Sequence, residues 1–92
     1  MSDEARATIE IVNKLGMHAR AASVFVQLAS TFTSDISVVR NGEEVNGKSI
    51  MGVLLLAAAK GTQIEIIARG KDAESAVQAL QQLVTDRFGE DS

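Results

Sequence analysis

The chain has 92 residues, a length that fits one domain, and a formal net charge of −3 at pH 7. It contains no cysteine and one histidine, which excludes a disulfide framework, a thiolate metal site and a histidine-rich metal site. The acidic balance argues against a nucleic-acid partner, because proteins that bind nucleic acids show a clustered basic face. With 46% hydrophobic but 3% aromatic residues, we expect a core of Val, Ile, Leu and Ala.

The first residues of the chain and its longest apolar run bear on where in the cell the protein is expected. Residues 1–4 are polar and acidic and lack the basic and apolar regions of a signal peptide. The apolar run over residues 50–59 is shorter than the ~20 residues that a membrane span needs. We therefore expect a cytoplasmic protein without membrane insertion, folded as one domain over residues 1–92. Its ordered core is expected over about residues 7–88, with short polar termini.

The first half of the chain predicts a strand, a helix and a hairpin. Alternating residues predict a strand over residues 7–12, followed by a loop over residues 13–17. Helical periodicity over residues 19–32 places one set of residues on an apolar face: Ala22, Phe25, Val26, Ala29 and Phe32. Strands are expected over residues 36–40 and 43–45, joined by a tight turn at Asn41-Gly42.

The second half predicts two more helices and one strand. An apolar helix is expected over residues 50–59, with Gly61 as the residue that ends it. A strand is expected over residues 62–68. Asp72 is a suitable N-cap for a last helix, whose apolar side is formed by Ala76, Val77, Leu80, Leu83 and Val84. The order β-α-β-β-α-β-α indicates an α+β domain with an antiparallel sheet and helices on one face.

His18 lies where the first loop meets the first helix. The unpaired N–H groups and the positive dipole end of a helix start favour an anion such as phosphate. A neutral imidazole can act as a nucleophile near pH 7, and Arg20 can add charge-assisted hydrogen bonds. The residues alone leave a second interpretation open, in which His18 caps the helix or is simply exposed.

The predicted helix over residues 50–59 has no polar face, although a surface helix on a two-layer domain normally shows one. Part of this helix is therefore expected to be exposed and apolar, as partner-binding patches often are. Met51 suits such an adaptable surface. The alternative is a wholly buried helix, which is hard to arrange in so small a domain.

Ser49 stands at the N-terminal edge of the same helix. Its ordinary role there is that of an N-cap. The alternative is a phosphorylation site, where the helix dipole tolerates a phosphate that places about −2 charge beside the apolar patch.

Residues 42–49, GEEVNGKS, match the phosphate-loop pattern of nucleotide-binding proteins. The context argues against a nucleotide site. Gly42 belongs to a hairpin turn, residues 43–45 are expected to form a strand, and Glu43 and Glu44 bring negative charge.

Two motifs together resemble the HPr family, the histidine-containing phosphocarriers of the bacterial phosphotransferase system. Residues 13–20, NKLGMHAR, resemble the active-site segment of that family. Residues 46–53, NGKSIMGV, resemble its regulatory-serine segment. The resemblance extends over residues 8–84. It departs at Ala21, where the family usually has proline after the arginine. NKLGMHAR looks like the nitrogen-related branch, whereas KSIMGV looks like the branch with regulatory serine phosphorylation, so the sequence mixes cues for carbon and nitrogen pathways.

The resemblance implies an open-faced β-sandwich, four antiparallel strands covered by three helices, without cofactor or metal. It implies that His18 takes a phosphoryl group on Nδ1 from enzyme I and passes it to a IIA-type domain. Arg20 would stabilise the phosphate, and Ser49 would be modified by an HPr kinase/phosphorylase. The expected docking surface comprises Met17, Ala19, Ile50, Met51, Leu54 and Leu55. The protein would be a monomeric carrier rather than a stand-alone enzyme.

Two rival hypotheses belong to other functional classes. One is a regulatory interaction module that acts mainly through phosphorylation of Ser49. The other is a small ligand-binding regulatory domain of ferredoxin-like kind, which would not need His18, Arg20 and Ser49 at these places.

Overall fold

The computed structural model describes residues 3–92. Its four strands are β1 (Glu4–Glu10), β2 (Asp35–Arg40), β3 (Glu43–Asn46) and β4 (Gln63–Arg69). Its helices are α1 (Ala19–Ala29), α2 (Ile50–Leu55), α3 (Ala73–Thr85) and a short 3₁₀ helix, η1 (Arg87–Gly89). Apart from η1, this is the element order that the sequence predicts.

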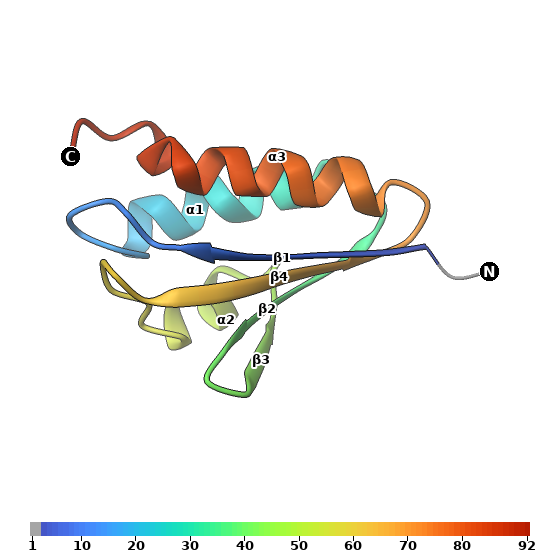
Figure 1. Cartoon of the computed structure of the whole chain (residues 1–92), viewed down its shortest axis with the longest axis horizontal. Helices are drawn as coiled ribbons and strands as arrows, with labels where there is room; N and C mark the ends of the chain where they lie inside the picture. The colour runs from blue at the N-terminus through green and yellow to red at the C-terminus, as the bar shows by residue number, and fades with distance from the viewer. Residues whose placement is uncertain (1–2) are drawn as a thin grey trace.

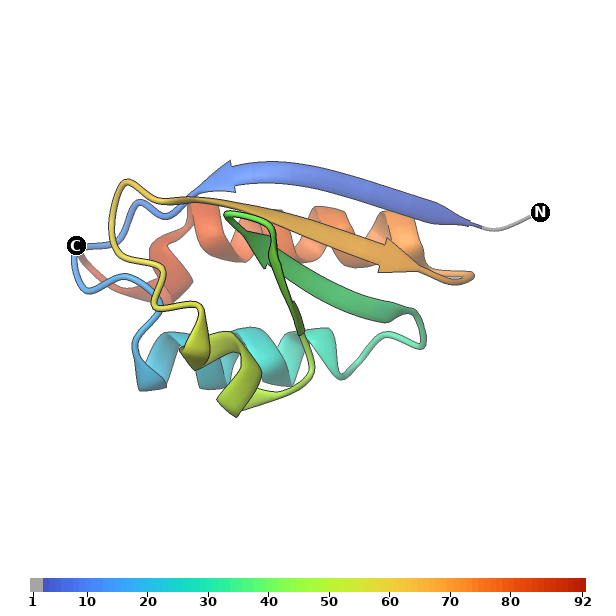
Figure 2. The same cartoon turned by 90° about the horizontal axis from the view of Figure 1, so that it is seen from below.

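The strands of the described residues form one antiparallel sheet in the order β1-β4-β2-β3. Helices α1 and α3 lie along one face of this sheet (Figure 1), and α2 packs beside α1 (Figure 2). The register pairs Ile9 with Ile64 and Val38 with Ile66, so apolar residues of neighbouring strands share the face that the helices cover. The predicted α+β class and open-faced sandwich are confirmed.

A hydrophobic core fills the space between the sheet and the helices. Its largest fully buried apolar side chains are Ile11, Phe25, Val38, Val53, Ile64, Ile66, Leu80 and Val84. The aliphatic character of this set follows from the low aromatic content of the chain. Four of the five residues predicted for the apolar face of α1 are buried, and Phe32, beyond the end of the helix, is half-buried.

Helix α2 is shorter than the sequence predicts, because it ends at Leu55 and not near residue 59. Ala57 adopts a left-handed conformation (φ 50°), and the carbonyl of Leu56 accepts a hydrogen bond of 2.7 Å from the Arg40 guanidinium. Ala58 is then buried in the core from a loop. The prediction that Gly61 ends this helix is therefore wrong. Helix α1 likewise ends at Ala29, three residues before its predicted end.

Asp72 occupies the predicted N-cap position of α3, but its carboxylate does not cap that helix. It accepts hydrogen bonds from the backbone N–H groups of Thr33 and Ser34, both at 2.9 Å, and from the Ser34 hydroxyl at 2.5 Å. These hydrogen bonds lower the pKa of Asp72 to about 2, and the one from the Ser34 hydroxyl contributes most. The carboxylate thus ties the start of α3 to the loop between α1 and β2.

Candidate functional site

His18 lies at the N-cap of α1, in extended backbone (φ −79°, ψ 179°), as the sequence predicts. The loop before it is fixed by a hydrogen bond of 2.8 Å from the N–H of Met17 to the carbonyl of Ala58. Gly16 has φ +67°, and a Cβ atom there would lie 2.6 Å from that carbonyl oxygen. Only glycine therefore permits this close approach of the two loops. The contact holds the start of α1 against the loop that follows α2.

The His18 side chain makes no capping hydrogen bond to its own helix. Its Nε2 instead lies 2.5 Å from Oε2 of Glu90, which follows η1 near the C-terminus. Asn13, fully buried, donates from Nδ2 both to Oε1 of Glu90 at 2.9 Å and to the carbonyl of Gly16 at 2.8 Å. The loop over residues 13–18 and the C-terminal segment, 72 positions apart at His18 and Glu90, are therefore joined here. The sequence analysis identified neither Asn13 nor Glu90 as a site residue.

Burial opposes ionisation of Glu90, but hydrogen bonds from Asn13 and His18, with the charges of His18 and Arg20, outweigh it. The pKa of Glu90 therefore lies below its ordinary value, and the group is a carboxylate near pH 7. A carboxylate only accepts hydrogen bonds, so the short contact places a hydrogen on Nε2 of His18. Nδ1 is the ring nitrogen that Glu90 does not contact.

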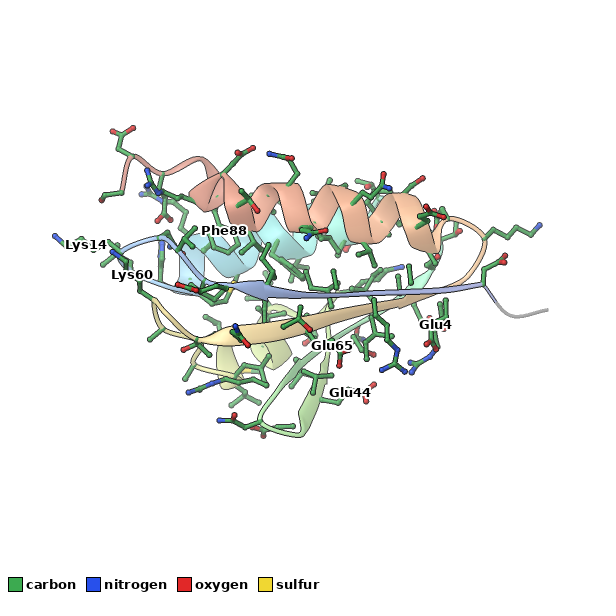
Figure 3. All side chains as sticks on the ribbon, in the orientation of Figure 1. Glu4, Lys14, Glu44, Lys60, Glu65 and Phe88 are labelled. Atoms are coloured by element: carbon green, nitrogen blue, oxygen red, sulfur yellow. The ribbon has the colours of Figure 1, made fainter. Side chains whose placement is uncertain are left out.

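The first turn of α1 has anion-binding character. Within residues 3–92, the N–H groups of Ala19, Arg20 and Ala21 have no hydrogen-bond partner, and the turn has no acidic residue. An open pocket of about 550 Å³ lies in front of it. That pocket is lined by Lys14, Leu15, His18, Arg20, Glu90, Asp91 and Ser92. Lys14 and Lys60 lie at the same end of the molecule (Figure 3).

Ser49 caps α2, as its ordinary role predicts. Its Oγ accepts a hydrogen bond of 3.1 Å from the N–H of Gly52. The phosphate-loop match at residues 42–49 has no continuous loop, because Glu43–Asn46 form β3. Asn41 and Gly42 both have positive φ, as the predicted tight hairpin requires.

Large exposed apolar side chains gather on α2 and on the loop before α1. These residues, hereafter the apolar patch, are Leu15, Ile50, Met51, Leu54 and Leu55, with Met51 the most exposed at 72%. The patch confirms that the apolar helix is partly exposed rather than wholly buried.

Two members of the expected docking surface differ from the others. Met17 is only 5% exposed and belongs to the hydrophobic core, so its side chain offers little surface to a partner. Ala19 is exposed at the start of α1, beside His18. Leu15, which is 67% exposed, was missed, although an apolar residue in a loop three positions before the histidine was a usable signal.

Residues 3–92 contain neither a three-ligand metal cluster nor a membrane-spanning helix. No group of three His, Cys, Asp or Glu side chains in this range is arranged to hold a metal ion. No helix in it has the length and apolar character needed to cross a bilayer.

The family model described as "PTS HPr component phosphorylation site" matches residues 5–86 of this chain. The chain belongs to the HPr family. The phosphocarrier protein HPr of Neisseria meningitidis serogroup A is 53% identical over 85 residues, which is 92% of this chain and 96% of that protein. The HPr-like protein Crh of Bacillus subtilis is 42% identical over 78 residues, covering 85% of this chain and 92% of Crh.

Solved HPr structures share the fold. That of HPr-C-His from Thermoanaerobacter tengcongensis has a TM-score of 0.92 at 45% identity and covers 96% of this chain and 99% of its own. The structure of an HPr dimer from the same organism has a TM-score of 0.76 at 48% identity. The match covers 91% of this chain and 97% of that chain. The resemblance stated from the two motifs is confirmed, and the chain is an HPr-type phosphocarrier of the phosphotransferase system.

Proposed function

We propose that His18 is the residue that carries the phosphoryl group, received from enzyme I and passed to a IIA-type domain. The observation that carries this proposal is the start of α1. A partly exposed imidazole and three unpartnered N–H groups lie there, and His18 and Arg20 both line one open pocket. Membership in a phosphocarrier family supplies the type of reaction.

The proposed chemistry follows from the parts of this pocket. The lone pair of Nδ1 of His18 attacks the phosphorus atom as the bond between phosphorus and the donor atom of enzyme I breaks. The phosphoryl oxygens then lie against the N–H groups of the first turn of α1, where the helix dipole favours negative charge. Arg20, exposed at the second position of the helix, adds charge-assisted hydrogen bonds.

The apolar patch is the proposed docking surface for enzyme I and for the IIA-type domain. It lies on α2, beside α1, and includes Leu15 in the His18 loop. A partner that covers the patch therefore also covers the pocket and excludes water from the transfer. The proposed carrier is a cytoplasmic monomer.

Ser49 is the proposed regulatory site, with an HPr kinase/phosphorylase as its partner. Its hydroxyl is half-buried at the start of α2, next to Ile50 of the apolar patch. A phosphate there adds about −2 charge at the edge of an apolar docking surface. A regulatory module acting mainly through Ser49 is the second candidate function, since one relative, Crh, is described as a catabolite repression HPr.

Incubation with phosphoenolpyruvate and enzyme I, followed by mass analysis, tests the proposal. We expect one acid-labile phosphate on the wild-type protein, none on His18→Ala and slower labelling of Arg20→Gln. Absence of labelling of the wild type, with labelling by a serine kinase and ATP, would contradict the carrier role of His18 and favour the regulatory candidate.

A further inference from the structure

The C-terminal segment turns back sharply after α3. Arg87, Phe88 and Gly89 have successive positive φ angles of 59°, 55° and 81°. A left-handed conformation is unfavourable for an arginine and a phenylalanine, so packing must hold it in place. Phe88 supplies that packing, since it is 6% exposed and belongs to the hydrophobic core. Figure 3 shows it below the end of α3.

This turn brings Glu90 to His18. The C-terminal segment and the loop before α1 lie at the same end of the molecule (Figures 1 and 2). Both oxygens of the carboxylate are engaged there, one by Nε2 of His18 and the other by Nδ2 of Asn13. The next residue, Asp91, lines the same pocket, but its side chain makes no hydrogen bond within residues 3–92. The contact with His18 is thus specific to Glu90 and does not arise from an acidic tail in general.

We infer that Glu90 is a positioning residue, which orients the imidazole of His18 through Nε2 and leaves Nδ1 as the nucleophilic nitrogen. This inference rests on the proposed carrier function of His18. Asn13, which is fully buried, donates to the other carboxylate oxygen and so holds Glu90 in place.

The role of Glu90 extends through the transfer step. When the Nδ1 lone pair forms the N–P bond, the bond between phosphorus and the donor atom of enzyme I breaks, and its electron pair returns to that donor atom. The proton on Nε2 stays in place, so the ring of His18 becomes positively charged. The Glu90 carboxylate lies 2.5 Å from Nε2 and balances this charge, as a carboxylate does for histidine in hydrolase triads.

A spectroscopic experiment tests the contact apart from any activity. In wild-type protein, NMR of the ring nitrogens is expected to show a hydrogen-bonded proton on Nε2 that exchanges slowly with solvent. Glu90→Ala is expected to lose this signal, whereas the control Asp91→Ala keeps it. A signal unchanged in Glu90→Ala would overturn the inference.

The kinetic experiment measures phosphoryl transfer from enzyme I. We expect kcat to fall about tenfold or more in Glu90→Ala, with KM nearly unchanged, because Glu90 is outside the apolar patch. Glu90→Gln has the same shape without the charge, and its kcat is expected to fall too, at an unchanged Tm. Wild-type rates in both variants would overturn the inference, whereas an unlabelled wild-type protein would overturn the proposed function itself.

Discussion

His18 and Ser49 both stand at the N-cap of a helix, yet their side chains bond to different parts of the chain. The Ser49 hydroxyl accepts a hydrogen bond from the N–H of Gly52, within its own helix. The His18 ring makes no such bond and is held from outside the helix by Glu90. The start of α2 is therefore capped by its own residue, whereas the N–H groups at the start of α1 stay available.

The two helix starts show that an N-cap residue can either stabilise its helix or leave the first N–H groups free for an anion. A side chain that caps a helix satisfies N–H groups that otherwise bind an anion. In α1 these N–H groups are left without a partner, and the His18 side chain is fixed by a residue that is 72 positions away. This difference supports the proposal that transfer takes place at the start of α1, whereas Ser49 stabilises the start of α2 and is the proposed regulatory site.

The apolar patch beside these two helix starts gives the largest expected effect. Met51→Glu is expected to weaken binding of enzyme I about tenfold or more, because a charge would be buried unpaired in the interface. Met51 is 72% exposed, so Tm should stay within about 3 °C of the wild type.

Titration calorimetry and thermal unfolding measure the two quantities. Gln78→Glu is the matched control, since it adds the same charge at an exposed site on α3. A large fall in Tm for Met51→Glu would show that Met51 is a core residue, and unchanged affinity would remove the patch from the docking surface.

At the start of a third helix, α3, the carboxylate of Asp72 ties two segments together. The folded-state pKa of Asp72, about 2, lies below its ordinary value of 3.8. Its ionised form therefore stabilises the fold above about pH 4, and this contribution is lost as the pH falls through 2. We expect Asp72→Asn to be less stable than the wild type at pH 7 and nearly equal to it near pH 2.

Chemical unfolding at a series of pH values measures this difference. Asp86→Asn, at the exposed other end of α3, is the control and should show no such convergence. A gap between Asp72→Asn and the wild type that persists unchanged to pH 2 would contradict the assigned role of the carboxylate.

The smallest expected effect concerns the Ser49 cap of α2. Ser49→Ala is expected to lower the free energy of unfolding by about 1 kcal/mol, because the N–H of Gly52 loses its acceptor. Ser49→Asp keeps an acceptor at the cap and serves as the control for stability. Denaturant unfolding measures both variants, and a fully stable Ser49→Ala would show that the cap contributes nothing.

The sequence predicted the elements and the position of His18 because these depend on local patterns. Periodicity located α1, a glycine hairpin signal located the β2–β3 turn, and the match to two short motifs identified the family. The end of α2 was missed because the apolar run continues beyond it, while the Arg40 contact and the left-handed Ala57 that end the helix are not local features.

The contact of Glu90 with His18 was beyond sequence analysis for a similar reason. It depends on the left-handed turn at Arg87 and Phe88, a conformation that neither residue type favours. Met17 adjoins His18 in the sequence, but its N–H donates to the carbonyl of Ala58 and its side chain lies in the core. Of two neighbours in the sequence, one can thus be buried in the core while the other is partly exposed to solvent.

The most direct test of the separate roles of the two helix starts is to map the phosphate after incubation with phosphoenolpyruvate and enzyme I. Tandem mass spectrometry at neutral pH would compare the wild type, His18→Ala and Ser49→Ala. We predict an acid-labile phosphate on His18 in the wild type and in Ser49→Ala, and none in His18→Ala. A phosphate that persists in His18→Ala, or one lost in Ser49→Ala, would contradict the assignment of transfer to the start of α1.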